Sequence, residues 1–281
     1  MLFEECPQRY QARYIDGVAS EPSLAMLFGH TVHTALEVLL QGQGGGCPVC
    51  AARNVDHGDG DAASRLDCAR AVYYQQFDIM RSILADEGVE AGGLLYLEGL
   101  RMIDQVDHLR LNDDGRSAPE RWFKIPTRWG GLTWPVVGAV DLWSPPWSKH
   151  GAVVWDFKTT VGSWSQERAE RERWQPLLYS WAYVRAFDVV PTFRYLVLNR
   201  VTGAVDTFDR TWAKRGDFIE DLTDLEFHAE EIAEAVAEGN FSCTRGHGTC
   251  LECGEPYGHD HVCRRPARAK VKLTGKLAEA R

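Results

Sequence analysis

The chain has 281 residues, of which 44% are hydrophobic and 25% are charged, and it carries a formal net charge of −9. This composition is ordinary for a globular protein with a substantial buried core. The negative net charge argues against a protein that binds nucleic acid nonspecifically over its whole surface. The charge is uneven, because residues 264–281 have a balance of +6 and residues 1–263 therefore one of −15.

The first half of the chain is predicted to be mainly helical. Residues 29–40 (GHTVHTALEVLL) have the spacing of an amphipathic helix, in which His33 and Glu37 share one face, one turn apart. Its apolar stripe consists of Val32, Leu36, Leu39 and Leu40. Residues 41–64 are glycine-rich and polar, which predicts an inserted loop.

Further helices and a set of strands follow. Helical patterns extend over about 62–86 and 91–112, and strand-like segments come after them: RWFKIPTRW, LTWPVVGAVDLW, GAVVWDFKTT, FRYLVLNRV and, beyond a Thr-Gly turn, AVDTFDR. A helical stretch at 165–187 separates the third segment from the fourth, which predicts a strand–helix–strand crossover. A last helix is expected at about 211–238. The sequence thus predicts an α/β core.

Charged side chains occur in two of these strands. In GAVDLW, Asp141 shares a strand face with Val137 and Ala139, and in VVWDFKTT Asp156 shares one with Lys158. If the two strands are neighbours, the carboxylates converge and suit a hard cation such as Mg²⁺ or Mn²⁺, with the lysine beside it to orient a water. The alternative is a structural salt bridge, which is commoner for an isolated D-x-K triplet.

Four motifs in order resemble those of PD-(D/E)XK nucleases of the RecB type. They are GHTVH (29–33), GAVD (138–141), DFK (156–158) and QPLLY (175–179). This group includes the CRISPR-associated RecB-like exonucleases and the nuclease domains of bacterial recombination helicases. The resemblance covers about residues 6–200 and implies a restriction-endonuclease-like mixed β-sheet core flanked by helices, with a helical N-terminal region.

The resemblance also implies roles for individual residues. The metal ligands would be His33, Asp141, Asp156 and the backbone carbonyl of Phe157. Lys158 would be the catalytic lysine, and Gln175 and Tyr179, four apart on one helical face, would support it and the DNA backbone. Because Pro176 follows Gln175, and a helix tolerates proline only in its first turn, that helix must begin close to Gln175.

The N-terminal residues and the cysteines indicate the compartment. MLFEECPQRY has acids where a signal peptide needs basic residues, and no run approaches the roughly 18 apolar residues of a membrane span. We therefore expect a cytoplasmic protein with no membrane partner. Eight cysteines in such a protein are more often reduced, metal-bound or catalytic than disulfide-paired.

The cysteines form groups that fit metal sites. A C-x-x-C pair presents two thiolates to one metal, and further cysteines complete a zinc or iron–sulfur site. The resemblance implies a [4Fe-4S] cluster that ties the termini together, with the ligands Cys6, Cys250, Cys253 and Cys263. A local zinc site, in which Cys243 joins the last three, is the alternative, with His247, His259 and His261 as possible substitutes.

The sequence does not decide the role of the remaining cysteines. For Cys47, Cys50 and Cys68, with His57, a second zinc and an unligated loop are both compatible with the sequence. The expected organisation is a nuclease domain over 1–240 that includes the inserted loop, a cysteine-rich metal-binding lobe over 241–263 and a basic tail over 264–281. The tail is expected to be solvated and disordered, and a phosphate-binding arm is the alternative.

Two functions from different classes follow. The first is a metal-dependent DNA exonuclease that acts on single-stranded or frayed ends in recombination, repair or phage DNA processing, with a helicase or recombination protein as a possible partner. The second is a non-catalytic, nuclease-derived module that binds nucleic acid or a partner through structural zinc. The presence of Asp141, Asp156 and Lys158 favours the first.

Overall fold

The computed structural model describes residues 7–17, 22–41, 62–86, 92–127 and 135–241. The chain divides into two compact units. The larger consists of residues 23–127 and 133–224, and the smaller of residues 1–22, 128–132 and 225–281.

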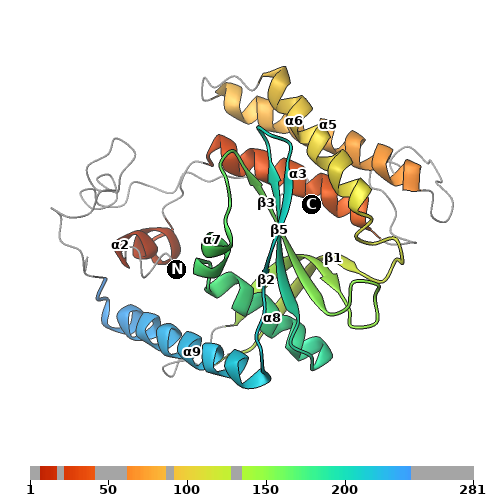
Figure 1. The fold of residues 1–281 in the computed structure, drawn as a ribbon. Coiled ribbons are helices and arrows are strands. Elements are labelled where there is room, and N and C mark those ends of the chain that lie inside the picture. The colour runs from red at the N-terminus through yellow and green to blue at the C-terminus, as the bar shows by residue number, and fades with distance from the viewer. Residues whose placement is uncertain (1–6, 18–21, 42–61, 87–91, 128–134, 242–281) are drawn as a thin grey trace. The chain divides into compact units, whose positions relative to one another are not determined.

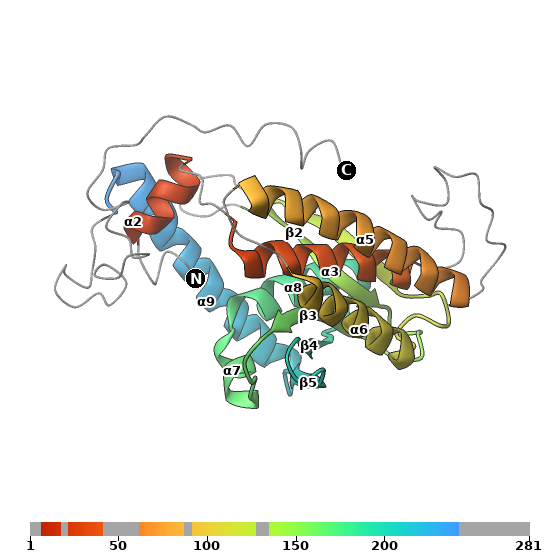
Figure 2. The ribbon, with the colours of Figure 1, turned by 90° about the horizontal axis from the view of Figure 1, so that it is seen from above.

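Helices cover one face of the sheet in the larger unit. α3 (Leu24–Leu40), α5 (Ala62–Asp86) and α6 (Gly93–Leu109) pack side by side over it (Figures 1 and 2). α3 begins earlier than predicted, because Ser23 caps it by accepting a hydrogen bond from the Met26 N–H at 3.2 Å. The predicted apolar stripe of α3 is confirmed, since all four of its side chains are buried.

The strands of the described residues form one five-stranded sheet in the order β1-β2-β3-β4-β5. Their bounds are β1 Ala118–Ile125, β2 Val136–Ser144, β3 Val153–Thr160, β4 Thr192–Asn199 and β5 Val205–Arg210. β3 and β4 are parallel, and the other neighbours are antiparallel. The predicted pairing of the second and third strands is therefore confirmed, as is the crossover.

The crossover between β3 and β4 covers the opposite face of the sheet with two helices rather than one. α7 (Gln166–Arg171) ends before α8 (Trp174–Phe187) begins, so the single helical stretch predicted at 165–187 is wrong in this respect. Pro176 supplies the reason: in a continuous helix its ring would clash with the carbonyl of Glu172, four residues earlier. α8 starts just before Gln175, as the proline predicted.

Two apolar clusters lie on either side of the sheet, and β3 contributes to both by alternation. Trp155 and Phe157 are buried with α3, α5 and α6, whereas Val154 is buried on the α8 side with Tyr195 of β4. This alternation places Asp156 and Lys158 together on the α8 side, because successive strand residues point to opposite faces. The predicted mixed α/β sheet flanked by helices is confirmed.

The described part of the smaller unit is helical. It contains α2 (Pro7–Tyr10), the π-helix η1 (Gln11–Ile15) and the second part of α9 (Arg215–Glu238), whose first ten residues belong to the larger unit. The Tyr10 and Phe241 rings stack with centroids 6.5 Å apart. No helix in the described ranges is both long enough and apolar enough to span a bilayer.

Candidate active site

The candidate site lies where β2 and β3 diverge. β2 pairs with β1 along nearly its whole length, but with β3 only through Leu142–Ser144 opposite Val153–Trp155. Asp141 and Asp156 are the first residues beyond this short ladder. At Phe157 the backbone N–H donates to Asp141 Oδ2 at 2.6 Å instead of to a β2 carbonyl. The divergence thus brings two carboxylates to one point.

His33 reaches the site from α3. Helix and strand approach closely at Gly29, where a Cβ would lie 3.3 Å from Thr159 Oγ1. One turn further, His33 Nδ1 lies 3.2 Å from Asp141 Oδ1, and its ring packs edge-on against Phe157 with centroids 6.2 Å apart. Burial lowers the pKa of His33, but the charge and hydrogen bond of Asp141 outweigh burial and raise the pKa above its usual value.

Asp156 is the buried carboxylate of the site, with only 2% of its surface exposed. Lys158 Nζ lies 2.7 Å from Asp156 Oδ2, and Gln175 Nε2 donates to Asp156 Oδ1 at 2.8 Å. Burial raises the pKa of Asp156 to about 6, and Asp141 adds to this shift, although the Lys158 ammonium opposes it. The site therefore holds an acid whose ionisation costs free energy.

Gln175 joins the lysine to the acid from the first turn of α8. Its Oε1 accepts from Lys158 Nζ at 2.9 Å, and its Nε2 donates also to the Tyr179 hydroxyl at 3.3 Å. Burial raises the pKa of Tyr179 to about 12, so this hydroxyl stays protonated near neutral pH. The i, i+4 pairing on one helical face, expected from the sequence, is what the structure contains.

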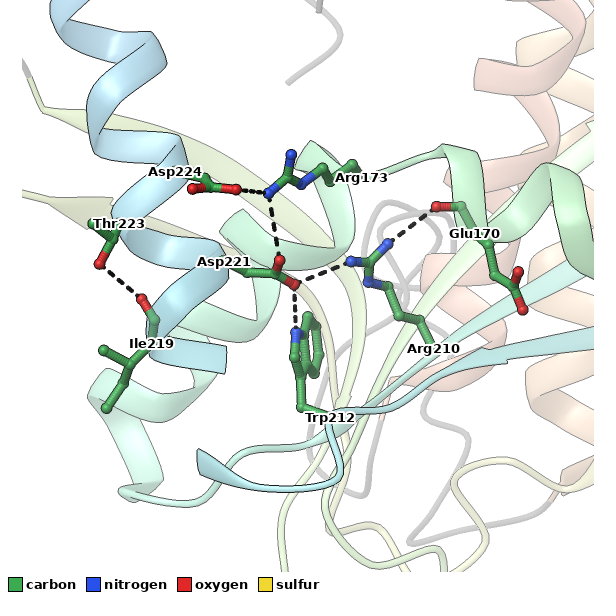
Figure 3. Close-up of polar contacts among 8 residues, drawn as sticks. All are labelled: Glu170, Arg173, Arg210, Trp212, Ile219, Asp221, Thr223 and Asp224. Carbon is green, nitrogen blue, oxygen red and sulfur yellow. Dashed lines mark hydrogen bonds and ion pairs between the residues drawn. The ribbon is translucent and has the colours of Figure 1, made fainter. Parts of the chain in front are cut away.

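A cluster of ion pairs fixes the start of α8 (Figure 3). Arg173, two residues before Gln175, donates to Asp221 and Asp224 of α9. Asp221 Oδ2 also accepts from Arg210 at 3.1 Å and from the Trp212 indole N–H at 2.8 Å. Sequence reasoning missed this cluster, since nothing local relates residue 173 to residue 221.

Tyr195 is a further neighbour that the sequence did not single out. It lies opposite Asp156 in the β3–β4 ladder, and Lys158 Nζ is 5.8 Å from the centre of its ring. The ring is buried, and burial raises the pKa of its hydroxyl. Parallel pairing of β4 with β3 was predictable, but the register that sets Tyr195 against Asp156 was not.

The donor atoms fit a hard divalent cation. Asp141, Asp156 and His33 offer two carboxylates and an imidazole, and oxygen-rich sets of this kind suit Mg²⁺ and Mn²⁺. Among the described residues, buried Asp156 Oδ2 accepts no hydrogen bond and has only the ion pair with Lys158. No group of three or more His, Cys, Asp or Glu side chains in these ranges is placed so that it could by itself hold a metal ion. The two acids are held instead by Phe157, His33, Lys158 and Gln175.

The proposed cysteine ligands lie outside the described residues. This applies to Cys6, Cys243, Cys250, Cys253 and Cys263, and also to Cys47, Cys50 and His57 of the expected loop. Cys68 is described, and it is buried on α5 beside Val38 and Val72. The last residues of the expected 41–64 loop already belong to α5, which starts at Ala62.

Comparisons with known proteins place this geometry in context. A family model described as the PD-(D/E)XK nuclease superfamily matches residues 1–263. A search of curated proteins by sequence found no match. Among solved structures, a candidate exonuclease from Eubacterium rectale aligns at 11% identity and a TM-score of 0.44, over 80% of this chain and 82% of that one. The protein SSO0001 aligns at 11% identity and a TM-score of 0.34, over 92% and 98%.

Proposed function

The chain belongs to the PD-(D/E)XK nuclease superfamily, and from this we propose that it is a metal-dependent deoxyribonuclease that digests DNA from single-stranded or frayed ends. Nucleases of this superfamily generally use divalent cations such as Mg²⁺. The observation that carries the proposal is the chain of contacts through Asp141, Asp156, Lys158 and Gln175, which sets two carboxylates and a lysine at the divergence of β2 and β3.

In this proposal Asp141, Asp156, His33 and the carbonyl of Phe157 hold Mg²⁺ or Mn²⁺. The chemistry such a cation supplies is a lowered pKa for water and charge neutralisation on the phosphate. His33 acts as a ligand in its neutral form, so it gives up the proton that its contact with Asp141 favours. This makes cation binding and loss of the His33 proton coupled events.

Lys158 has the task of orienting water and offsetting the charge that develops on the phosphate. Its ammonium is half-exposed beside the buried Asp156, so it can face a bound substrate while remaining paired. Gln175 holds the lysine by its carbonyl oxygen and Asp156 by its amide nitrogen, which fixes both relative to α8. Tyr179 in turn fixes the Gln175 amide.

The proposal extends to the cysteines. The family match runs from residue 1 to residue 263, so it includes every one of Cys6, Cys250, Cys253 and Cys263. This supports a role for them within the nuclease rather than in a separate appendage. We propose that they bind a [4Fe-4S] cluster, and zinc bound with Cys243 is the alternative that experiment must separate from it.

The nuclease proposal is tested on linear single-stranded DNA labelled at either end, with a circular single strand as the control. We expect progressive shortening of the linear DNA in Mg²⁺ or Mn²⁺, no nicking of the circle and no reaction in EDTA. The end from which label is lost first reports the polarity. Binding of DNA without cleavage in either cation would favour the non-catalytic module, and nicking of the circle would make the enzyme an endonuclease.

A further inference from the structure

Asp156, Gln175 and Tyr195 border the ammonium of Lys158 in the proposed active site. Lys158 Nζ lies 2.7 Å from Asp156 Oδ2, and it donates to Gln175 Oε1 at 2.9 Å. It also lies over the ring of Tyr195, 5.8 Å from the ring centre. An ammonium within about 6 Å of an aromatic centre is attracted by the electron-rich face of the ring. Tyr195 therefore contributes to the position of this ammonium.

The pairing of β3 with β4 brings the ring and the lysine together. In the parallel ladder Tyr195 lies opposite Asp156, and Val197 lies opposite Lys158. Tyr195 and Val197 are buried in the apolar cluster on the α8 side of the sheet, which is the side on which Asp156 and Lys158 contact Gln175. The register of this ladder thus determines which aromatic side chain lies next to the lysine.

The Tyr195 ring is held in place by other aromatic rings. It is fully buried, and the Phe193 ring packs edge-on against it with centroids 4.9 Å apart. The Trp164 ring, from the segment between β3 and α7, contacts it with centroids 5.1 Å apart. A large side chain that is packed among such neighbours cannot change its rotamer without disturbing them. The ring is therefore a fixed surface beside the lysine.

An aromatic ring suits the proposed task of Lys158 better than a second acid would. The lysine needs its positive charge to offset the charge that develops on the phosphate. Asp156 already forms one ion pair with it, and another carboxylate would neutralise it further. The face of a ring attracts the ammonium through its quadrupole and carries no net charge. Tyr195 can thus restrain the ammonium and leave its charge available to the substrate.

The hydroxyl of Tyr195 is separate from this contact. It is buried and has no hydrogen-bond partner among the described residues. A buried hydroxyl without a partner costs free energy. The favourable contact with Lys158 therefore comes from the ring alone, and a phenylalanine at this position would present the same face.

We propose that Tyr195 is a positioning residue, whose ring holds the Lys158 ammonium in the orientation in which it acts on the phosphate and the water. The inference rests on the proposed nuclease function and adds to it a residue outside the ordered motifs. Tyr195 acts through Lys158 and has no contact of its own with the DNA or the cation.

The test compares Tyr195→Leu with Tyr195→Phe on linear single-stranded DNA in Mn²⁺. Tyr195→Leu should lower kcat about 10-fold, because the ammonium loses the restraint of the ring. KM should change little, since no contact with the DNA is removed. Tyr195→Phe should retain the wild-type kcat and KM. If Tyr195→Leu does not fold, Tyr195→Met fills more of the space without supplying a ring, and the same loss of kcat is expected from it.

The matched control is Tyr73→Leu. Tyr73 is also a fully buried tyrosine, but it lies on α5 in the cluster on the other face of the sheet. Its substitution should lower Tm while kcat stays at the wild-type value, measured at a temperature at which circular dichroism shows all variants folded.

The outcomes separate the two proposals. If the wild type cleaves DNA but the leucine or methionine variant at position 195 keeps the kcat of Tyr73→Leu, the positioning role is wrong while the nuclease proposal stands. The same conclusion follows if Tyr195→Phe loses as much kcat as Tyr195→Leu, because the hydroxyl would then be the active group. If the wild type does not cleave DNA, both proposals are wrong.

Discussion

Lys158 Nζ lies 2.7 Å from Asp156 Oδ2, so β3 carries its own counter-charge two residues beyond its buried acid. We predict that Lys158→Ala and Asp156→Ala each lower kcat by about 100-fold or more, since one removes the amine that orients water and the other a cation ligand. Both side chains lie outside the apolar clusters, so circular dichroism should show an intact fold. Near-wild-type Mn²⁺-dependent cleavage by either variant would contradict the assignment of the site.

The raised pKa of Asp156, about 6 in the fold against an ordinary 3.8, makes a prediction about stability and pH. Because the folded protein binds this proton more tightly than the unfolded chain, the contribution of Asp156 to stability is present at low pH and is lost as the pH rises from about 4 to about 6. Asp156→Asn cannot ionise. In EDTA, the Tm of Asp156→Asn minus the Tm of the wild type should therefore increase as the pH rises from about 4 to about 6, and it should stay constant at higher pH. A Tm difference that does not change with pH would count against the shifted pKa.

Gln175 should affect cleavage by positioning Lys158 and Asp156, the two residues to which it is hydrogen-bonded. Gln175→Ala removes the acceptor of Lys158 and a donor to Asp156, and loss of such supporting contacts typically lowers activity about 10- to 100-fold. The effect should appear in kcat at saturating Mn²⁺, with little change in Tm. Gln166→Ala, which removes an exposed glutamine of α7, is the matched control and should behave as the wild type. Equal activity of the two variants would remove Gln175 from the mechanism.

Asp221 should matter more for stability than an ordinary surface acid. Asp221→Ala leaves Arg173, Arg210 and the Trp212 indole without a shared acceptor (Figure 3), and loss of charged hydrogen bonds of this kind costs about 2 kcal/mol. Asp188→Asn removes only the negative charge from the exposed pair with Arg215 and should cost less than about 0.5 kcal/mol. Urea unfolding measures both, and similar losses would show that the cluster is not a structural anchor.

Cys6 distinguishes the two metal proposals, because only the iron–sulfur cluster requires it. Anaerobically purified protein should then be brown, and Cys6→Ser should lose both the colour and much of the stability, since the cluster joins distant parts of the chain. The zinc alternative gives a colourless protein with about one or two zinc ions, in which Cys6→Ser is nearly silent and Cys243→Ser releases metal. A colourless, zinc-free and stable protein would contradict both.

Much of the fold could be predicted from the sequence, because helices and strands are indicated by patterns among residues close together in the chain. The 3.6-residue stripe of α3 and the alternation in β3 identify elements and faces, and Pro176 marks where α8 begins. The candidate site came from ordered motifs, and the structure brings His33, Asp141, Asp156 and Lys158 together as they implied. What could not be predicted depends on how strands and helices are placed in three dimensions.

Three features illustrate that limit. The short ladder between β2 and β3, the register that sets Tyr195 opposite Asp156, and the bond from Arg173 to Asp221 join residues far apart in the chain. The periodicity of apolar residues within one element carries no information on contacts between residues far apart in the chain.

The bond between the Phe157 N–H and Asp141 ties a proposed metal ligand to the main chain. An acid that only held a cation could be lost once a lineage no longer needed catalysis, whereas Asp141 also satisfies a backbone donor where the neighbouring strand has turned away. Loss of Asp141 would leave that donor without its acceptor, at a cost comparable to a broken hydrogen bond. Selection for folding alone therefore acts to retain an oxygen acceptor at position 141. Among the described residues Lys158 contacts only side chains, those of Asp156, Gln175 and Tyr195, so no hydrogen bond to the main chain acts in the same way to retain it.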